Sequence, residues 1–399
     1  MRIESDLSLE KYRDTRKPGS YQWWYFDGIS DDGLYAFTII FYLGNPFSQR
    51  YIRALERLHS GKMSRAGHPG IADDKLGDAG NDETVAKAYP AISISVYKSG
   101  KPVYYGFREH QHDDAGFGSD RLTIRIGQNR IERECEEDRL IYRLSLNQKL
   151  PSGDRISGTL ALESINFTLT EAEYDAETNA QADSKVRSET VVGEKEVETE
   201  SLHLWNLLQP VSRVDGELNI DGYQEFRIPF SGKGYHDHNV GEEPMDALFR
   251  NWYWGRFHFG SLSLVYYLME KHQKWQEHAW LVDSSGRARI LRGDYFVEDR
   301  SRNLFGLKSG RKIRMEGQGS RFLIQQQKLI DNGPFYQRFL SQAVLETNGR
   351  LYKQRGITEF LNPGRIRRRI FWPLVHMRIV YPEKPHWVQK YPALYRWTW

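Results

Sequence analysis

Cysteine is almost missing from this sequence of 399 residues, in which Cys135 is the single thiol. One cysteine cannot form a disulfide within the chain, and this suits a reducing compartment. Long apolar runs are missing too, because no stretch approaches the roughly 20 apolar residues that span a bilayer. The N-terminus, Met1 to Asp6, also lacks the apolar segment that a secretory signal needs. We therefore expect a cytoplasmic protein.

Neither sign of charge predominates, since 56 Lys and Arg residues face 53 Asp and Glu residues. Binding to phosphate backbones needs a strong basic excess, so nucleic acid is not an expected partner. The sequence also has no Walker A loop, no Rossmann glycine fingerprint and no Gly-x-Ser-x-Gly elbow. The class of function that remains is chemistry without a cofactor on a hydrophobic small molecule.

Aromatic residues are abundant, at 13% of the chain, and large rings bury much area per residue. Apolar and polar side chains alternate along most of the chain, as in the segment 91–97, and turn signals separate the runs. This pattern predicts an all-β protein built of antiparallel meanders, with Tyr51 to Leu58 as the best short helix. Two polar segments, near 60–84 and 170–200, carry no strand signal and are predicted to be surface insertions.

One pattern occurs in both halves of the chain. The run Gln22-Trp-Trp-Tyr-Phe26 precedes a long apolar strand at 33–43, and Asn251-Trp-Tyr-Trp-Gly255 precedes another at 260–268. Because an amide residue, a set of aromatic residues, a short turn and an apolar strand follow in the same order, we infer a duplicated hairpin. Each copy is expected to open a barrel-like domain, with domains at 1–243 and 244–399.

Several motifs resemble those of a known family. The run from Gln22 to Phe26 is similar to the Glu-Trp-Trp-Tyr motif of the carotenoid 1,2-hydratase (hydroxyneurosporene synthase) and AttH-like superfamily. The run Gly234-Tyr-His-Asp-His-Asn239, followed by Trp252 to Arg256, resembles its second signature, and His376 to Pro382 resembles a late strand of the family. The sequence departs from the family pattern at Gln22, where Glu is usual, and at Val240, where an aromatic residue is common.

The resemblance implies two lipocalin-like antiparallel β-barrel domains packed together, and polyene, terpenoid or polyketide substrates. The superfamily includes hydratases and fungal enzymes that catalyse Diels–Alder cyclisation, so membership alone leaves the reaction open. An enzyme that hydrates, dehydrates or cyclises a lipophilic substrate is favoured. The alternatives are a pericyclase that works by holding its substrate in one pose and a carrier of a hydrophobic molecule without catalytic activity.

The segment from Gly234 to Asn239 is the candidate site, and we expect it to be extended between a turn at 231–234 and a loop at 241–244. An extended chain projects His236 and His238 to one face, and Asp237 and Asn239 to the other. A carboxylic acid whose pKa is raised by an apolar pocket can protonate an alkene. We therefore assign Asp237 as the candidate acid, with His236 or His238 as its partner.

Aromatic faces can stabilise the cation that protonation creates, and Trp252 and Trp254 are the candidate wall. Arg256 would be buried only if paired, and pairing with Asp237 would lower the pKa of that aspartate. On the second apolar strand, alternation places Tyr266 and Glu270 together at a polar end of the cavity. The candidate substrate-binding residues are Trp24, Tyr235, Asn239, Trp252, Trp254, Arg256, Tyr266 and Glu270.

Two other interpretations of the segment stay open. His236 and His238 followed by Glu242 match the first half of a cupin metal site, but no second half follows, so no metal is assigned. Alternatively, the polar side chains satisfy backbone groups at a domain junction. Separately, the basic run Arg365 to Arg369 beside Phe371 is either a solvated surface or a contact with anionic lipid headgroups.

Overall fold

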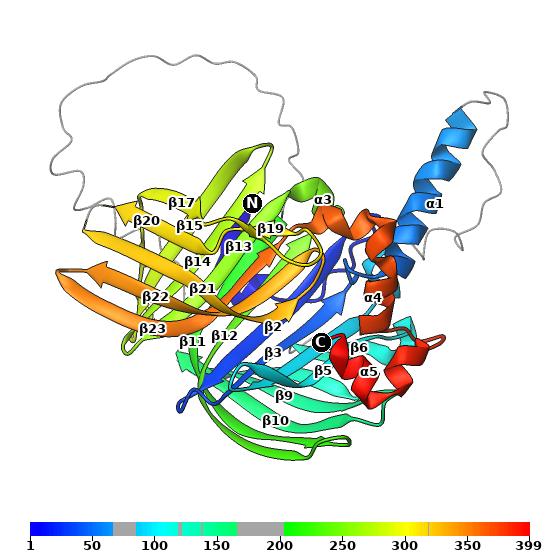
Figure 1. The fold of residues 1–399 in the computed structure, drawn as a ribbon, viewed down its shortest axis with the longest axis horizontal. Coiled ribbons are helices and arrows are strands. Elements are labelled where there is room, and N and C mark those ends of the chain that lie inside the picture. Colours follow the sequence, from blue (N-terminus) through cyan, green and yellow to red (C-terminus); the bar gives the residue numbers. More distant parts are fainter. Residues whose placement is uncertain (67–84, 119–121, 137–138, 166–202, 318) are drawn as a thin grey trace.

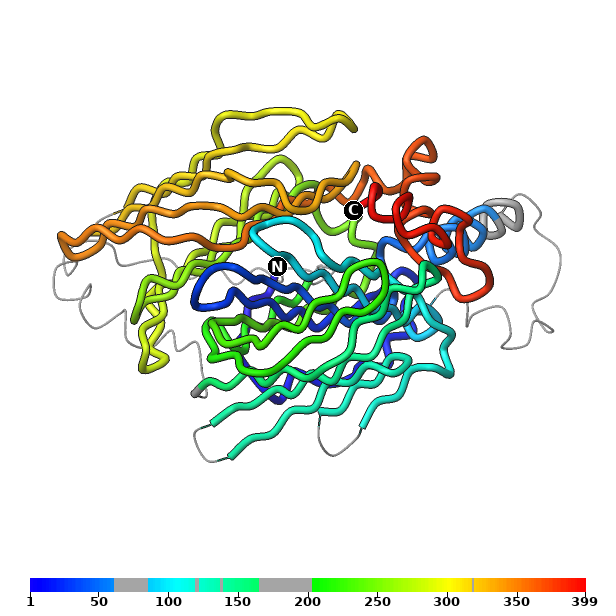
Figure 2. Tube along the Cα trace, turned by 60° about the horizontal axis from the view of Figure 1, so that its bottom comes forward, coloured from blue at the N-terminus to red at the C-terminus, as the bar shows by residue number. Residues whose placement is uncertain are grey.

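The computed structural model describes residues 1–66, 85–118, 122–136, 139–165, 203–317 and 319–399. The insertion predicted at 170–200 lies outside the described residues, as does most of the one predicted at 60–84. The described chain is dominated by β-strands, in two curled sheets that lie one above the other (Figure 2). The predicted all-β, lipocalin-like architecture is confirmed, and each sheet has the shape of a half-barrel.

The first sheet has 13 strands. Its order is β24-β5-β4-β3-β2-β12-β11-β10-β9-β8-β7-β6, with β1 paired to β11. The pairs are antiparallel except for β1 with β11 and β24 with β5. Its strands are β1 (Arg2–Glu4), β2 (Tyr21–Ser30), β3 (Tyr35–Leu43), β4 (Ala91–Lys98), β5 (Lys101–Glu109), β6 (Ala115–Phe117), β7 (Thr123–Ile126), β8 (Asn129–Glu136), β9 (Arg139–Lys149), β10 (Arg155–Ile165), β11 (His203–Asp221), β12 (Phe226–Gly241) and β24 (Ile379–Val380).

The second sheet has nine strands in the order β16-β15-β14-β13-β23-β22-β21-β20-β17. Its strands are β13 (Asn251–Phe259), β14 (Leu262–Lys271), β15 (Lys274–Asp283), β16 (Ala288–Ile290), β17 (Asp294–Glu298), β20 (Lys312–Gly317), β21 (Ser320–Asn332), β22 (Tyr336–Thr347) and β23 (Arg350–Leu361). A separate ribbon joins β18 (Ser301–Arg302) to β19 (Lys308–Ser309). The two copies of the repeated motif form the hairpins β2–β3 and β13–β14.

Helices occupy the ends of the sheets (Figure 1). The predicted helix at 51–58 lies inside α1, which extends away from the sheets, and α4 and α5 lie beside the C-terminal strand β24. Among the described residues no helix is both long and apolar enough to cross a membrane. The helices are η1 (Leu7–Leu9), α1 (Gln49–Ala66), η4 (Ala86–Ala88), η5 (His112–Asp114), α3 (Met245–Leu248), η7 (Pro363–Arg367), η8 (Arg369–Phe371), α4 (Trp372–Arg378), η9 (Trp387–Lys390) and α5 (Pro392–Trp397).

The central strands of both sheets are buried on both faces. This explains why β2 and β3 read as nearly continuous aromatic and β-branched runs, because one face packs inside the first sheet and the other against the second sheet. Strands further from the junction, such as β9, alternate buried and exposed side chains. One large apolar core therefore includes residues of both sheets.

The turn predicted at 231–234 is wrong, because β12 runs unbroken from Phe226 to Gly241. Its glycines serve close strand packing instead: a Cβ at Gly232 would lie 2.2 Å from the carbonyl oxygen of Ile29. The segment His376 to Pro382, likened to a family strand, is the end of α4 followed by the two-residue strand β24.

Candidate functional site

Strand β12 carries the candidate segment between β2 and β11, in the middle of the first sheet. Its side chains alternate as expected. Tyr235 and Asp237 face the second sheet, where the ring of Tyr235 lies 5.0 Å from that of Trp254 on β13. His236 and His238 face the interior of the first sheet. The register that achieves this pairs Asp237 with Tyr25 on β2 and with Leu207 on β11.

Asp237 is buried and holds three hydrogen bonds from side chains. Its Oδ2 accepts from the indole nitrogen of Trp205 at 2.8 Å and from the hydroxyl of Tyr235 at 2.7 Å, while Oδ1 accepts from Asn239 at 2.8 Å. Burial raises the pKa of Asp237 to about 7, although the bonds from Tyr235 and Trp205 act in the opposite direction. The carboxyl group can therefore carry a proton near neutral pH and deliver it.

Aromatic rings surround this carboxyl group. Trp205 contacts Tyr267 at 5.0 Å and Trp280 at 5.4 Å between ring centroids, and Trp252 lies 5.5 Å from Tyr267. Within the described part of the chain, the hydroxyl of Tyr267 and the indole nitrogen of Trp252 are buried without a hydrogen-bond partner. A buried polar atom normally has a partner, so each of these two groups has an unused capacity to donate a hydrogen bond.

The histidines occupy the opposite face of β12. His236 stacks on Phe26 with ring centroids 4.0 Å apart, and its Nε2 lies 2.8 Å from Glu10. His238 stacks on Trp24 at 4.7 Å, and burial lowers its pKa well below the usual value. Because alternation separates the two faces, the pairing expected between Asp237 and a histidine is replaced by pairing with Tyr235, Trp205 and Asn239.

The cupin-like residues do not converge. Glu242 forms an ion pair with Lys17 at the surface, whereas His236 is held by Glu10 inside the first sheet. In the described ranges no group of three or more His, Cys, Asp or Glu side chains is arranged to hold a metal ion.

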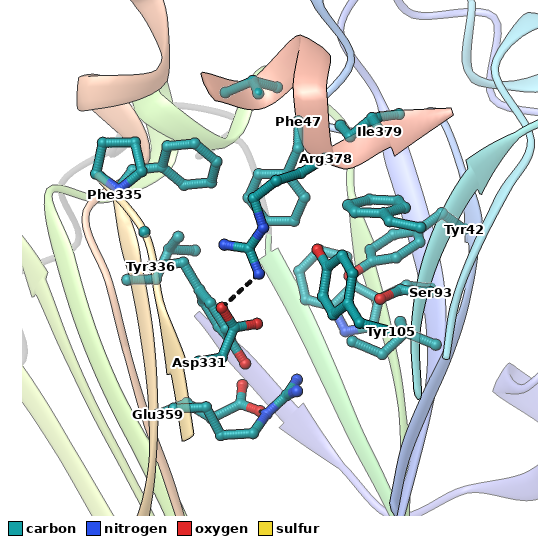
Figure 3. A pocket seen from close by; sticks show the side chains of 18 of the residues that line it. Tyr42, Phe47, Ser93, Tyr105, Asp331, Phe335, Tyr336, Glu359, Arg378 and Ile379 are labelled. Carbon is teal, nitrogen blue, oxygen red and sulfur yellow. Dashed lines mark hydrogen bonds and ion pairs between the residues drawn. The ribbon is translucent and has the colours of Figure 1, made fainter. Parts of the chain in front are cut away.

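A cavity of about 100 Å³ lies between the two sheets and beneath α4 (Figure 3). One wall comes from β2, β3, β4 and β5 and the other from β13, β21, β22 and β23, so both halves of the chain build it. Most of the lining is apolar or aromatic. The lining side chains include Trp23, Tyr25, Tyr42, Ser93, Tyr105, Trp252, Asp331, Tyr336, Arg338, Glu359, Leu374, Val375 and Arg378.

Two ion pairs interrupt this apolar lining. Arg378 reaches down from α4 to Asp331 at 2.7 Å, as Figure 3 shows, and Arg338 contacts Glu359 at 2.8 Å. The hydroxyl of Tyr25 lies 3.0 Å from Glu359 Oε1 and also 3.0 Å from an oxygen of Asp27. The cavity therefore has a polar floor that can hold water or a hydroxyl group.

Sequence reasoning missed these charged residues, because each pair joins two separate elements, β22 with β23 for Arg338 and Glu359, and α4 with β21 for Arg378 and Asp331. Asp27 offered one signal, since it directly follows the aromatic run of the first repeat. Arg256 occupies the corresponding place in the second repeat and pairs with Asp27, through Nε at 2.8 Å, and not with Asp237. The contacts Trp23–Trp252 and Tyr25–Trp254, at 5.7 and 5.1 Å, join equivalent residues in the same way.

The remaining candidates lie at different distances from this cavity. Trp252 lines it, and Trp254 lies between Tyr25 and Tyr235. Trp24 lies with His238 on the far face of the first sheet. Tyr266 is buried in the separate core of the second sheet, and Glu270 accepts a hydrogen bond from Asn251 near the surface.

The pair of curled sheets with a cavity between them defines the class of fold. The crystal structure of an AttH-type protein from Nitrosomonas europaea superposes with a TM-score of 0.53 at 14% identity, covering 90% of this chain and 97% of that one. This likeness shows the fold and supports the lipocalin-like, AttH-like architecture predicted from the sequence motifs.

The carotenoid hydratase CrtC family matches residues 182–390, and the chain belongs to this family. The hydroxyneurosporene dehydrogenase of Chlorobaculum tepidum is 27% identical over 380 residues, which cover 93% of this chain and 90% of that protein. An acyclic carotenoid 1,2-hydratase of Thiocapsa roseopersicina is 25% identical over 359 residues, covering 87% and 71%. The family predicted from the motifs is confirmed, and the protein is an enzyme of the hydro-lyase type.

Proposed function

We propose that this enzyme adds water, without a cofactor, to an isolated terminal double bond of an acyclic carotenoid. The family membership and the relative named an acyclic carotenoid 1,2-hydratase support this substrate class. The observation that carries the proposal is the buried carboxyl group of Asp237, whose pKa of about 7 lets it donate a proton to carbon.

In the proposed reaction, protonated Asp237 transfers its proton to the less substituted carbon of the double bond. The π electrons form the new C–H bond and leave a tertiary carbocation. A water molecule then forms a C–O bond at the cationic carbon and releases its surplus proton to solvent, and a proton from solvent restores the carboxyl group of Asp237. Water is consumed, the carboxyl group is regenerated, and no oxidant or reductant is required.

The rings near Asp237 supply the second requirement, which is stabilisation of the cation. Tyr267 contacts both Trp205, which is bonded to the carboxyl group, and Trp252. An aromatic face is worth about 0.5–2 kcal/mol to a desolvated cation. Tyr235 and Trp205 orient the carboxyl group through their hydrogen bonds. These aromatic rings also limit the access of bulk water, which keeps the pKa of the acid high.

One end of the polyene is proposed to lie in the cavity between the sheets. Asp237 does not line this cavity itself, whereas Trp23, Tyr25 and Trp252 do. Tyr25 contacts both regions, because its ring lies 6.0 Å from that of Tyr235 and its hydroxyl lies 3.0 Å from Glu359. We propose that the terminal isoprene unit reaches from the cavity past the ring of Tyr25 toward Asp237, while Glu359 and Tyr25 position the attacking water.

The decisive experiment replaces the acid by its amide. Asp237→Asn is expected to keep substrate binding and to lower the rate of formation of the hydroxylated carotenoid by at least about 100-fold. Asp154→Asn provides a matched control, because Asp154 is also buried but lies in the turn between β9 and β10. Unchanged turnover in Asp237→Asn would contradict the acid role and favour catalysis by shape alone. Saturable binding without product in the unaltered protein would instead indicate a carrier.

A further inference from the structure

Four large apolar side chains are exposed on the C-terminal helices η9 and α5. Trp387 is 60% exposed, Tyr391 57%, Leu394 45% and Trp397 80%. We call this set the C-terminal aromatic surface. Tyr391, Leu394 and Trp397 recur at a spacing of three, whereas Tyr395 on the same helix is completely buried. Helix α5 therefore fixes itself to the body of the protein through Tyr395 and presents its other large side chains to solvent.

The surrounding chain has a strong basic excess. The last 37 residues carry eight arginines and lysines against one acidic residue, Glu383, whereas the preceding residues carry 48 against 52. Glu383 is paired with Arg50, and four of the arginines are paired with acidic side chains elsewhere in the fold, namely Arg367 with Asp246, Arg369 with Glu56, Arg378 with Asp331 and Arg396 with Asp154. The exposed positive charges that remain are those of Lys384 and Lys390, beside the aromatic surface in the sequence, and of Arg368, before α4. Apolar aromatic side chains and positive charge are thus concentrated in the same segment of a chain whose overall charge is nearly balanced.

The segment from η9 to α5 is hydrogen-bonded to the region of α4, the helix that covers the cavity and forms its lid. The side-chain amide of Gln389 donates to the carbonyl oxygens of Met377 and Ile379, both at 3.0 Å. The hydroxyl of Tyr395 donates to the carbonyl oxygen of Arg378 at 3.1 Å. The helix that receives these bonds, α4, lines the cavity with Leu374, Val375 and Arg378. Figure 1 shows α4 and α5 together at one end of the molecule.

We propose that the C-terminal aromatic surface docks the enzyme on a bilayer that contains anionic phospholipids. Tryptophan and tyrosine favour the interface between lipid headgroups and acyl chains, and lysine and arginine are attracted to anionic headgroups. A second protein or a second copy of the chain fits less well, because two copies would bring their basic segments together. Docking through η9 and α5 places the lid of the cavity at the membrane, where a lipophilic substrate is dissolved. The contact does not depend on the hydration chemistry, so it can be measured without turnover.

The test is sedimentation of the full chain with vesicles of phosphatidylcholine alone or with a quarter phosphatidylglycerol. The unaltered protein is expected to bind the mixed vesicles and to be released by high salt. The double variant Trp387→Ala, Trp397→Ala is expected to bind at least about 100-fold more weakly, because it removes the two most exposed side chains of the surface. Neutralising Lys384→Gln and Lys390→Gln is expected to weaken binding to mixed vesicles about 25-fold, at about fivefold for each charge.

The control variant Leu304→Ala, Leu351→Ala removes two exposed leucines outside this surface and is expected to bind as the unaltered protein does. Far-UV circular dichroism and thermal unfolding verify that each variant is folded. Equal binding of the Trp387/Trp397 variant and the unaltered protein would overturn the proposal, as would failure of the unaltered protein to bind either vesicle. Self-association on size exclusion that is lost in the Trp387/Trp397 variant would assign the surface to a second copy and also overturn it.

Discussion

Asp27 and Arg256, 229 positions apart, occupy the same place in the two copies of a repeated hairpin and form a buried ion pair with each other. The same relation joins Trp23 to Trp252 and Tyr25 to Trp254. Because equivalent residues meet in this way, β2 and β13 face each other across the junction of the two sheets. The floor and walls of the cavity depend on this contact, since Tyr25 links Asp27 to Glu359.

Removing Arg256 should destabilise the fold strongly. Arg256→Ala leaves Asp27 buried without its partner, and breaking one half of a buried pair typically costs about 3–5 kcal/mol. Urea unfolding measures the change. Arg213→Ala is the matched control, because Arg213 pairs with Asp31 and Asp215 at the surface, where a pair contributes at most about 1 kcal/mol. Equal losses in the two variants would show that burial of the Asp27–Arg256 pair has no special weight.

The raised pKa of Asp237 also predicts how stability depends on pH. The folded protein holds this proton up to about pH 7, whereas the unfolded chain releases it near the ordinary value of 3.8. The contribution of protonated Asp237 to the free energy of unfolding is therefore complete below about pH 4 and is lost as the pH rises through 7. Its full size is on the order of 4 kcal/mol, from about three pKa units. Asp237→Asn should remove this part of the slope between pH 4 and 8 in urea unfolding. Parallel curves for the two proteins would contradict the raised pKa.

Tyr235 should tune the acid without carrying the proton to the substrate. Its hydroxyl lowers the pKa of Asp237, so Tyr235→Phe is expected to raise that pKa and move the alkaline limb of the pH–rate profile to higher pH. Loss of orientation should also reduce kcat. Turnover measured from pH 5 to 9 gives both kcat and the pH of the alkaline limb. Tyr223→Phe, at an exposed tyrosine, is the control. A lower kcat with an unmoved limb would indicate a purely structural role for Tyr235.

Filling the cavity should impair substrate binding more than chemistry. Ser93 on β4 lines the cavity, and Ser93→Leu places additional apolar volume inside it. We expect a higher KM with a smaller change in kcat, measured with the carotenoid substrate. Ser157→Leu introduces the same side chain on β10, outside the cavity lining. If both variants raise KM equally, the substrate does not occupy this cavity.

Local patterns in the sequence predicted what lies within one strand or one repeat. Alternation correctly separated Asp237 from His236 and His238, and the aromatic runs marked the two hairpins at the centre of the sheets. The predicted domain boundary near residue 243 and the roles of the site residues stay predictions. The turn predicted from the glycines near 232 is wrong, because the sequence does not distinguish a glycine that close strand packing requires from a glycine that a turn requires.

Pairing between the sheets could not be predicted, because it depends on how two curled surfaces dock. The hydrogen bond between Glu359 and Tyr25, for example, needs the register of β23 and the orientation of the second sheet. The bond from Trp205 to Asp237 likewise depends on the register between β11 and β12.

The cavity takes one wall from each sheet, and this has a consequence for how such an enzyme can arise and fail. A single copy of the hairpin presents only an open aromatic face, so the enclosed space comes into being when the two copies meet. Substrate shape can then be altered by mutating either copy separately, while any change that loosens their contact abolishes the chamber without touching an acid or a ring.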